Sequence, residues 1–153
     1  MSGVSDDQSS RMNPLVLALA RREASWAREH LEEDAVAWLT TATPDGRLQS
    51  SLISFVYADG ALLLYSDPKA PKVRNLQASP EVSFHLQSDP FGDHWLIVEG
   101  RAFVDPAVPP LDEHPAYVAK FVGLYPHWGL DLTTAAHDIS AAIRIQPTRV
   151  RVG

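Results

Sequence analysis

The chain has 153 residues, 45% of them hydrophobic, and a formal net charge of −6 at pH 7. These values suit one compact domain and argue against a disordered chain and against general binding of nucleic acid or anionic membranes. Cysteine is absent, which excludes disulfides, iron–sulfur clusters and thiolate zinc sites. No apolar run approaches the roughly 18 residues of a membrane helix, and the polar, acidic start does not resemble a signal peptide, so we expect a cytoplasmic protein.

The N-terminal part of the chain predicts a polar tail followed by helices. Residues 1–12 are small and polar without periodicity, and we expect a disordered tail there, before a single domain at residues 13–153. From Pro14 to Glu33, apolar residues such as Leu15 and Leu19 recur among good helix formers, which predicts one or two amphipathic helices.

A meander of three strands is predicted next. Val36–Thr41 is predicted to form a half-buried strand, Leu48–Tyr57 forms the second strand, and Ala61–Ser66 forms the third. Tight turns separate them, because Pro44-Asp45-Gly46 and Asp59-Gly60 are strong turn signals. The third strand is apolar on both faces, so we expect it to lie centrally in the sheet.

The second half of the chain adds three strands and two helices. The predicted helices are Lys69–Ala78 and Leu111–Leu124. The predicted strands are Glu81–Gln87, Trp95–Asp105 and Ser140–Val152. Gly100, inside the second of these strands, indicates a bulge or a close backbone approach. The order predicts a mainly β protein, a six-stranded antiparallel split β-barrel with flanking helices, because closure of a sheet removes exposed edges.

The scarce lysines gather at the start of the first of these two helices. The chain has ten arginines and three lysines, and Lys69 and Lys72 lie between the end of the third strand and the helix. Amide groups at a helix N-terminus attract anions, and Ser66 and Arg74 would add donors. On spacing alone a solvated basic helix start is the more common explanation, but a phosphate cradle is favoured by a basic cluster on an acidic protein.

The second strand and the aromatic residues offer further candidates. The small polar residues of Gln49–Ile53 could bind the edge of a flat heterocycle, or could simply be solvent-facing residues of an ordinary strand. Trp26 and Trp38 occupy apolar periodic positions and are predicted to be core residues. Trp95 and Trp128 lie near loops, where packing or dimer contact is favoured over ligand contact.

No catalytic or metal-binding set of side chains is recognisable. The histidines lack metal-ligand spacing, and the motifs of a nucleophile elbow, a Gly-rich phosphate loop and a dinucleotide-binding turn are missing. If the protein is an enzyme, a cofactor should therefore supply the reactivity.

Six short segments in a fixed order carry a resemblance to a known family. They are Val36–Thr41, Pro44–Arg47, Leu64–Ser66, Lys72–Leu76, Ser79–Ser83 and Val98–Ala102. This series, covering roughly residues 34–105, resembles the pyridoxine 5′-phosphate oxidase-like split β-barrel superfamily. It is most similar to the branch of reductases that depend on the deazaflavin coenzyme F420.

The resemblance implies a homodimer with two cofactor sites at the subunit interface. As the residue spacing indicates, we expect no catalytic side chain and no metal. The cofactor-binding residues that the resemblance implies are Gln49, Ser50, Ser51, Leu52 and Ile53 along the ring, Tyr65, Ser66, Lys69, Pro71, Lys72 and Asn75 around the phosphate, and Trp95 beside the ring. His127 and Trp128 are candidates for a contribution from the partner chain.

The same resemblance favours F420 over flavin mononucleotide (FMN). Flavin-binding oxidases of this superfamily usually carry Arg where Gln49 stands and Lys near Ser54, and both are absent here. Their absence disfavours the dianionic phosphate of FMN and suits a singly charged phosphodiester. The predicted function is hydride transfer between reduced F420 and a small organic acceptor.

Three alternatives remain open. They are an FMN-dependent oxidoreductase of the same fold, a non-catalytic carrier of flavin, deazaflavin or haem, and, ranked low for want of a basic aromatic face, an oligonucleotide-binding barrel. The expected partners are a second copy of the chain and a small-molecule substrate, without nucleic acid or membrane.

Overall fold

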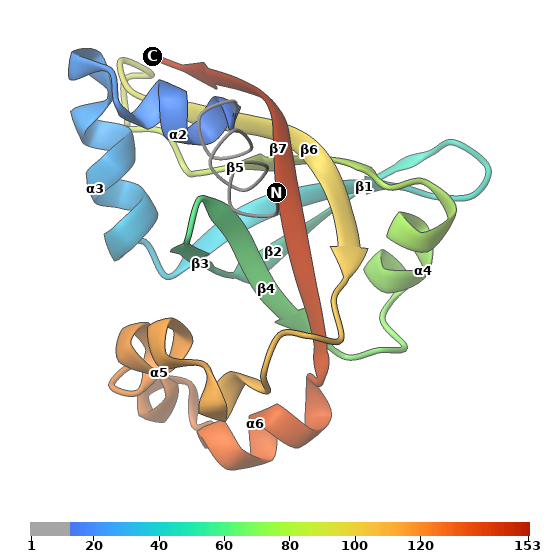
Figure 1. Cartoon of the computed structure of the whole chain (residues 1–153). Helices are drawn as coiled ribbons and strands as arrows, with labels where there is room; N and C mark the ends of the chain where they lie inside the picture. Colours follow the sequence, from blue (N-terminus) through green and yellow to red (C-terminus); the bar gives the residue numbers. More distant parts are fainter. Residues whose placement is uncertain (1–12) are drawn as a thin grey trace, which may run out of the picture.

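The computed structural model describes residues 13–153, which form one antiparallel sheet that curls on itself, with helices around it (Figure 1). The strands are β1 (Val36–Ala42), β2 (Leu48–Ser54), β3 (Val56–Ala58), β4 (Ala61–Ser66), β5 (Glu81–His85), β6 (Leu96–Val104) and β7 (Ala141–Val152). Their order in the sheet is β2-β1-β5-β6-β7-β4-β3. The predicted mainly β, antiparallel fold is confirmed, whereas the predicted tail, residues 1–12, lies outside the described residues. Within residues 13–153, no helix combines the length and apolarity needed to cross a membrane.

The sheet has seven strands, so the prediction of six is wrong. The segment predicted as one strand, Leu48–Tyr57, is broken at Phe55. β2 pairs with β1 at one end of the sheet, and β3 pairs with β4 at the other end. Phe55 is fully buried and packs edge-to-face against Phe84, with ring centroids 5.0 Å apart. This buried aromatic anchor fixes the corner, which a continuous strand-like sequence pattern does not reveal.

Three helices close the interior of the curled sheet. These are α2 (Pro14–Leu19), α3 (Ser25–Glu33), joined to α2 through the 3₁₀ turn η1 (Arg22–Ala24), and α4 (Pro71–Ala78). Their apolar residues, such as Leu15, Leu31 and Leu76, join the strands' inward residues in one core cluster. The predicted helices between Pro14 and Glu33 are thus confirmed, and burial of this apolar surface is the main stabilising term.

A second cluster covers the outer face of β4. It is formed by η2 (Leu111–Glu113), α5 (Pro115–Phe121), η3 (Tyr125–Trp128) and α6 (Leu132–Asp138), which lie together at the bottom of Figure 1. The prediction that Ala61–Ser66 lies centrally is wrong, because β4 is second from an edge. Leu64 faces the inner core, while Leu63 and Tyr65 pack against the helices, so both faces are buried.

The predicted helix Leu111–Leu124 is divided in two. His114 adopts an extended conformation, and its Nδ1 accepts a hydrogen bond from the Tyr117 backbone N–H at 3.2 Å. Pro115 then begins α5, in the first-turn position where its missing N–H costs nothing. Tyr117 and Phe121 are fully buried in the second cluster.

The tryptophan and glycine predictions have mixed outcomes. Trp26 is only partly buried, at the edge of the inner core, and stacks on His30 at 4.2 Å. Trp38 is not a core residue, because its buried neighbours in β1 direct it to the outer face. Gly100 does lie at a register shift between β6 and β7. A Cβ there would lie 2.5 Å from the carbonyl oxygen of Gln146, so the close backbone approach requires glycine.

Lys120 fastens α5 to the corner between β2 and β3. Its Nζ donates to the carbonyl of Phe55 at 2.9 Å and of Leu31 at 3.4 Å, and lies 3.8 Å from the centroid of the Phe55 ring. Burial lowers the pKa of Lys120 from 10.5 to about 8, against a smaller opposing effect of Asp34. The two carbonyls and the face of the Phe55 ring therefore stabilise the Lys120 ammonium group, while its partial loss of hydration opposes them.

This lowered pKa predicts a specific pH dependence of stability. The folded protein releases the Lys120 proton near pH 8 and the unfolded chain near 10.5, so the free energy of unfolding gains a contribution as pH rises between these values. We expect the unfolding free energy of the wild type minus that of Lys120→Met, measured with urea, to become more positive from pH 8 to pH 10. A difference that does not change with pH would contradict the placement of Lys120.

Candidate functional site

The segment between β4 and α4 forms a turn that leads into a helix start without a side-chain cap. The Asp67 carboxylate accepts a hydrogen bond from the Lys69 backbone N–H at 2.8 Å, and the Asp67 carbonyl accepts one from Ala70 at 3.0 Å. This turn delays the helix to Pro71, two residues later than predicted. Ala70 provides no side-chain cap. Pro71 has no N–H, and the Val73 N–H donates to the Ala70 carbonyl at 3.0 Å, so the backbone N–H of Lys72 is the first-turn donor left for an anion.

A buried asparagine ties α4 to the first two strands. Asn75 is 4% exposed, and its Nδ2 donates to Thr41 Oγ1 at 3.0 Å and to Gln49 Oε1 at 2.7 Å. Thr41 and Gln49 lie directly opposite each other on β1 and β2. One helix residue therefore fixes the position of α4 against two strands at once.

These contacts border an open hollow between β2 and the start of α4. It has a volume of 320 Å³ and is lined by Thr41, Gln49, Ser50, Ser51, Pro71 and Lys72. β2 is an edge strand of the sheet, so one side of its backbone has no strand partner within residues 13–153. A second hollow of 510 Å³ shares Gln49 and Pro71 with the first and extends it past Arg47 and Arg74.

Lys72 supplies the positive charge of the hollow. Its side chain is half-buried, and burial lowers its pKa. No carboxylate of residues 13–153 forms an ion pair with it. A partly desolvated ammonium group at a helix start without a side-chain cap is an arrangement that an anionic ligand would stabilise.

Gln49, Ser50, Ser51, Pro71 and Lys72 line this hollow, and Asn75 lines its extension; each was predicted for the site. Of the other predicted residues, Ser66 and Ile53 are buried and line neither hollow. Leu52 points to the outer face and Lys69 is exposed, and neither lines either hollow.

Two predicted residues lie elsewhere. Tyr65 packs edge-to-face on Tyr117 at 5.0 Å, and its hydroxyl donates to the Pro109 carbonyl at 2.6 Å. Burial raises the pKa of Tyr65 to about 12. Trp95 lies beside the C-terminal Gly153 and exchanges backbone hydrogen bonds with it. Within one chain, neither side chain reaches the hollow.

Thr41 is the site residue that the sequence prediction missed. It is 1% exposed and lies on the inward face of β1 with Ala37 and Leu39. A threonine in an inward position of an alternating strand needs a polar partner, which could have marked it. His127 and Trp128, on η3, are exposed, and their contribution from a partner chain stays a prediction.

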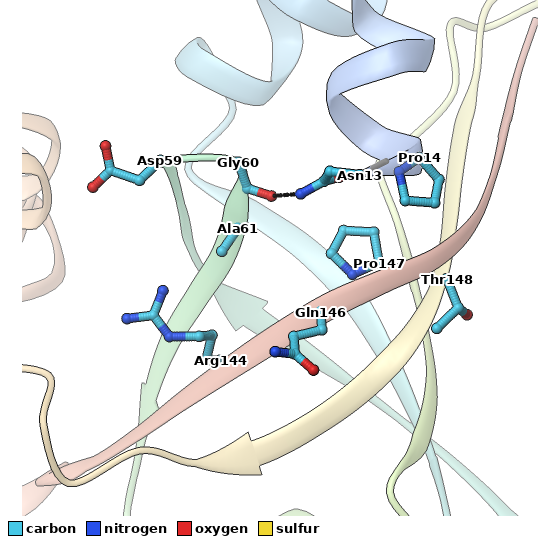
Figure 2. A pocket seen from close by; sticks show the side chains of 9 residues that line it. All are labelled: Asn13, Pro14, Asp59, Gly60, Ala61, Arg144, Gln146, Pro147 and Thr148. Atoms are coloured by element: carbon cyan, nitrogen blue, oxygen red, sulfur yellow. Dashed lines mark hydrogen bonds between the residues drawn. The ribbon is translucent and has the colours of Figure 1, made fainter. Parts of the chain in front are cut away.

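A larger hollow lies elsewhere but offers fewer free polar groups. It measures 560 Å³ and is bounded by the start of α2, the β3–β4 turn and β7 (Figure 2). Asn13 there is already engaged, because it caps α2 and its Nδ2 donates to the Gly60 carbonyl at 2.8 Å. Arg144 is paired with Asp105 at 3.1 Å. The smaller hollow is therefore the better anion site, since Lys72 has no such pair within residues 13–153.

The chemistry available in the hollow is that of binding rather than of side-chain catalysis. Among residues 13–153, no three histidine or carboxylate side chains gather to hold a metal ion. The lining offers an ammonium group, amide and hydroxyl donors, and a free strand edge. These groups fit a flat heterocycle that carries an anionic tail, and a redox coenzyme has that form.

Several solved structures share the fold of this chain. Solved structures with the same fold include an F420 reductase (26% identity, TM-score 0.60, 81% of this chain and 94% of that chain covered). They also include the haem storage protein HutZ from Vibrio cholerae (18% identity, TM-score 0.63, 86% of this chain and 95% of that chain covered). A third is a conserved hypothetical protein from Mycobacterium tuberculosis (20% identity, TM-score 0.68, 86% of this chain and 87% of that chain covered).

Sequence comparison assigns the family. No curated protein matches the sequence significantly. Residues 26–152, however, match the pyridoxamine 5′-phosphate oxidase family over most of the chain, including the hollow and every strand. The chain therefore belongs to the pyridoxamine 5′-phosphate oxidase family.

Proposed function

We propose that the protein is an F420-dependent oxidoreductase that transfers a hydride between reduced deazaflavin and a small organic acceptor. The observation that carries the proposal is Lys72, a half-buried ammonium group at an uncapped helix start, facing a hollow along a free strand edge. Membership of a family that includes oxidoreductases supports it.

The protein's own residues would bind and orient the coenzyme. F420, when bound, supplies the hydride chemistry of its ring. The ammonium group and the backbone N–H of Lys72 would hold the phosphodiester, and the backbone edge of β2 with Ser50 and Ser51 would donate to the polar edge of the ring. Orientation and exclusion of water would then provide the rate enhancement, because no catalytic side-chain set is recognisable.

The choice of F420 over FMN rests on the charge of the hollow. The hollow presents neutral Gln49 where flavin-binding oxidases of the superfamily usually carry Arg, and Ser54 replaces a nearby Lys. Lys72 is the one cationic side chain that lines this hollow, whereas Arg47 and Arg74 line only its extension. A single cation suits a singly charged phosphodiester better than a dianionic phosphate. The 26% identity with a solved F420 reductase points the same way.

Titration with the two coenzymes tests the proposal. We expect oxidised F420 to bind at micromolar concentration, followed by its fluorescence, and FMN to bind more weakly. Turnover of reduced F420 with a panel of acceptors then separates an oxidoreductase from a carrier. Tighter binding of FMN would favour the flavin alternative, and binding without turnover would favour the carrier.

The two lysines at the helix start provide a matched pair of variants. Lys72→Ala should weaken F420 binding by about 1–3 kcal/mol, because it removes a charge-assisted contact. Lys69→Ala removes the same charge from an exposed side chain that does not line the hollow, so its effect should be small. Equal losses in the two variants, measured by fluorescence titration, would mean that Lys72 has no special contact.

We further propose that the protein is a homodimer through the outer face of β1 and β2. Apolar side chains are exposed there: Val36 (38%), Leu48 (76%) and Leu52 (54%), with partly exposed Trp38 directly opposite Leu52. An apolar patch of this kind marks an interface. A second copy seated on it would cover the open side of the hollow, because β2 borders both.

A charge placed in this patch should separate the subunits. Leu52→Asp should convert a dimer to a monomer in sedimentation experiments, because the interface would bury an unpaired carboxylate. Leu17→Asp is the control, since Leu17 on α2 is similarly exposed (53%) but lies outside the patch. A monomeric wild type, or identical behaviour of the two variants, would refute the proposed interface.

A further inference from the structure

We propose that Asn75 is a positioning residue that turns the Gln49 amide so that its NH₂ group, and not its oxygen, faces the anionic ligand. The identity of this ligand as F420 rests on the proposed function. The positioning role itself rests on the contacts among Asn75, Thr41 and Gln49.

The hydrogen bonds leave the Gln49 amide a single useful orientation. Asn75 Nδ2 donates one hydrogen to Thr41 Oγ1 and the other to Gln49 Oε1. With its oxygen held by Asn75, Gln49 retains the two N–H donors of Nε2. Gln49 lines both the hollow beside Lys72 and its extension, so these donors remain available to a ligand there.

Burial makes this orientation effective. Gln49 itself is exposed, and a free glutamine in that position would present its oxygen and nitrogen to the ligand in turn. Asn75 is 4% exposed and Thr41 is 1% exposed, so the bonds that hold Gln49 start from groups with little access to water. A preorganised donor binds an anion more tightly than a mobile one, because less freedom is lost on binding.

The Gln49 amide also contributes without adding charge. Lys72 provides the positive charge of the hollow, and a neutral donor beside it can bind a second oxygen of a singly charged group. The arrangement therefore selects ligands that carry one negative charge at this position. The alternative is that Asn75 merely fastens α4 to the sheet, for which the bond to Thr41 alone would suffice.

A double-mutant cycle separates the two roles. We expect Gln49→Ala and Asn75→Ala each to weaken F420 binding roughly tenfold, as for loss of one hydrogen bond to a charged group. In the Gln49→Ala background, Asn75→Ala should have almost no further effect. Gln77→Ala, an exposed change on the same helix, is the control and should leave binding unchanged. An equal loss from Asn75→Ala in both backgrounds, or no loss at all, would overturn the positioning role.

A near-isosteric variant guards against misfolding. Asn75→Asp keeps the size of the side chain, but its carboxylate only accepts hydrogen bonds, so it should capture Gln49 Nε2 and turn Oε1 toward the ligand. We expect a loss of more than tenfold, part of which disappears in the Gln49→Ala background. A loss that is unchanged there would be electrostatic and would contradict the proposal.

A spectroscopic probe distinguishes failure of this inference from failure of the proposed function. Inorganic phosphate should shift the NMR signal of the Gln49 side-chain NH₂ group in the wild type and not in Asn75→Asp. If F420 does not bind but this shift occurs, the positioning role stands and the proposed function is wrong. If F420 binds and the Gln49 signal responds equally in both proteins, the positioning role is wrong and the proposed function stands. Absence of any response to phosphate or F420 overturns both.

Discussion

The corner at Phe55 is the constraint on which the architecture depends. Only this residue separates β2 from β3, yet the two strands lie at opposite ends of the hydrogen-bonded sheet. The chain can satisfy both pairings only if the sheet curls until its ends meet, and burial of the Phe55 ring against Phe84 holds that corner. Lys120 adds a bond to the carbonyl at the same point. The curl leaves β2 as a free edge, and α4 lies beside it.

The candidate site combines this free edge with a local excess of positive charge on an acidic protein. Burial costs the Lys72 ammonium group part of its hydration, and no carboxylate of residues 13–153 compensates it. An anionic ligand would recover that cost, so the site is poised for binding. By contrast, the larger hollow near Asn13 contains Arg144, whose charge Asp105 already balances. The hollow beside Lys72 is therefore preferred as the anion site because its charge is unbalanced, although the hollow near Asn13 has the larger volume.

Local signals in the sequence are sufficient for most strands and for the helix start beside the hollow. Strand-like runs bounded by turn residues predict the strands, and the basic cluster around Lys72 indicates the helix that begins at Pro71. The break at Phe55 could not be predicted, because each side of the corner continues the same strand-like pattern. Tyr65 could not be placed from local pattern either, since the outer face of β4 is buried by helices that follow 40 residues or more later. The inward position of Thr41 could be recognised from its strand, but its polar partner could not, because Asn75 lies 34 residues away in the sequence.

A crystal structure of the protein with F420 would test the central claim most directly. The account predicts the coenzyme phosphodiester within hydrogen-bonding distance of Lys72 Nζ and of the Lys72 backbone N–H, with the ring along the edge of β2. It also predicts a second copy of the chain against the outer face of β1 and β2. A coenzyme bound instead in the hollow between Asn13, Gly60 and Arg144, or a phosphodiester in contact with neither Lys72 nor α4, would contradict it.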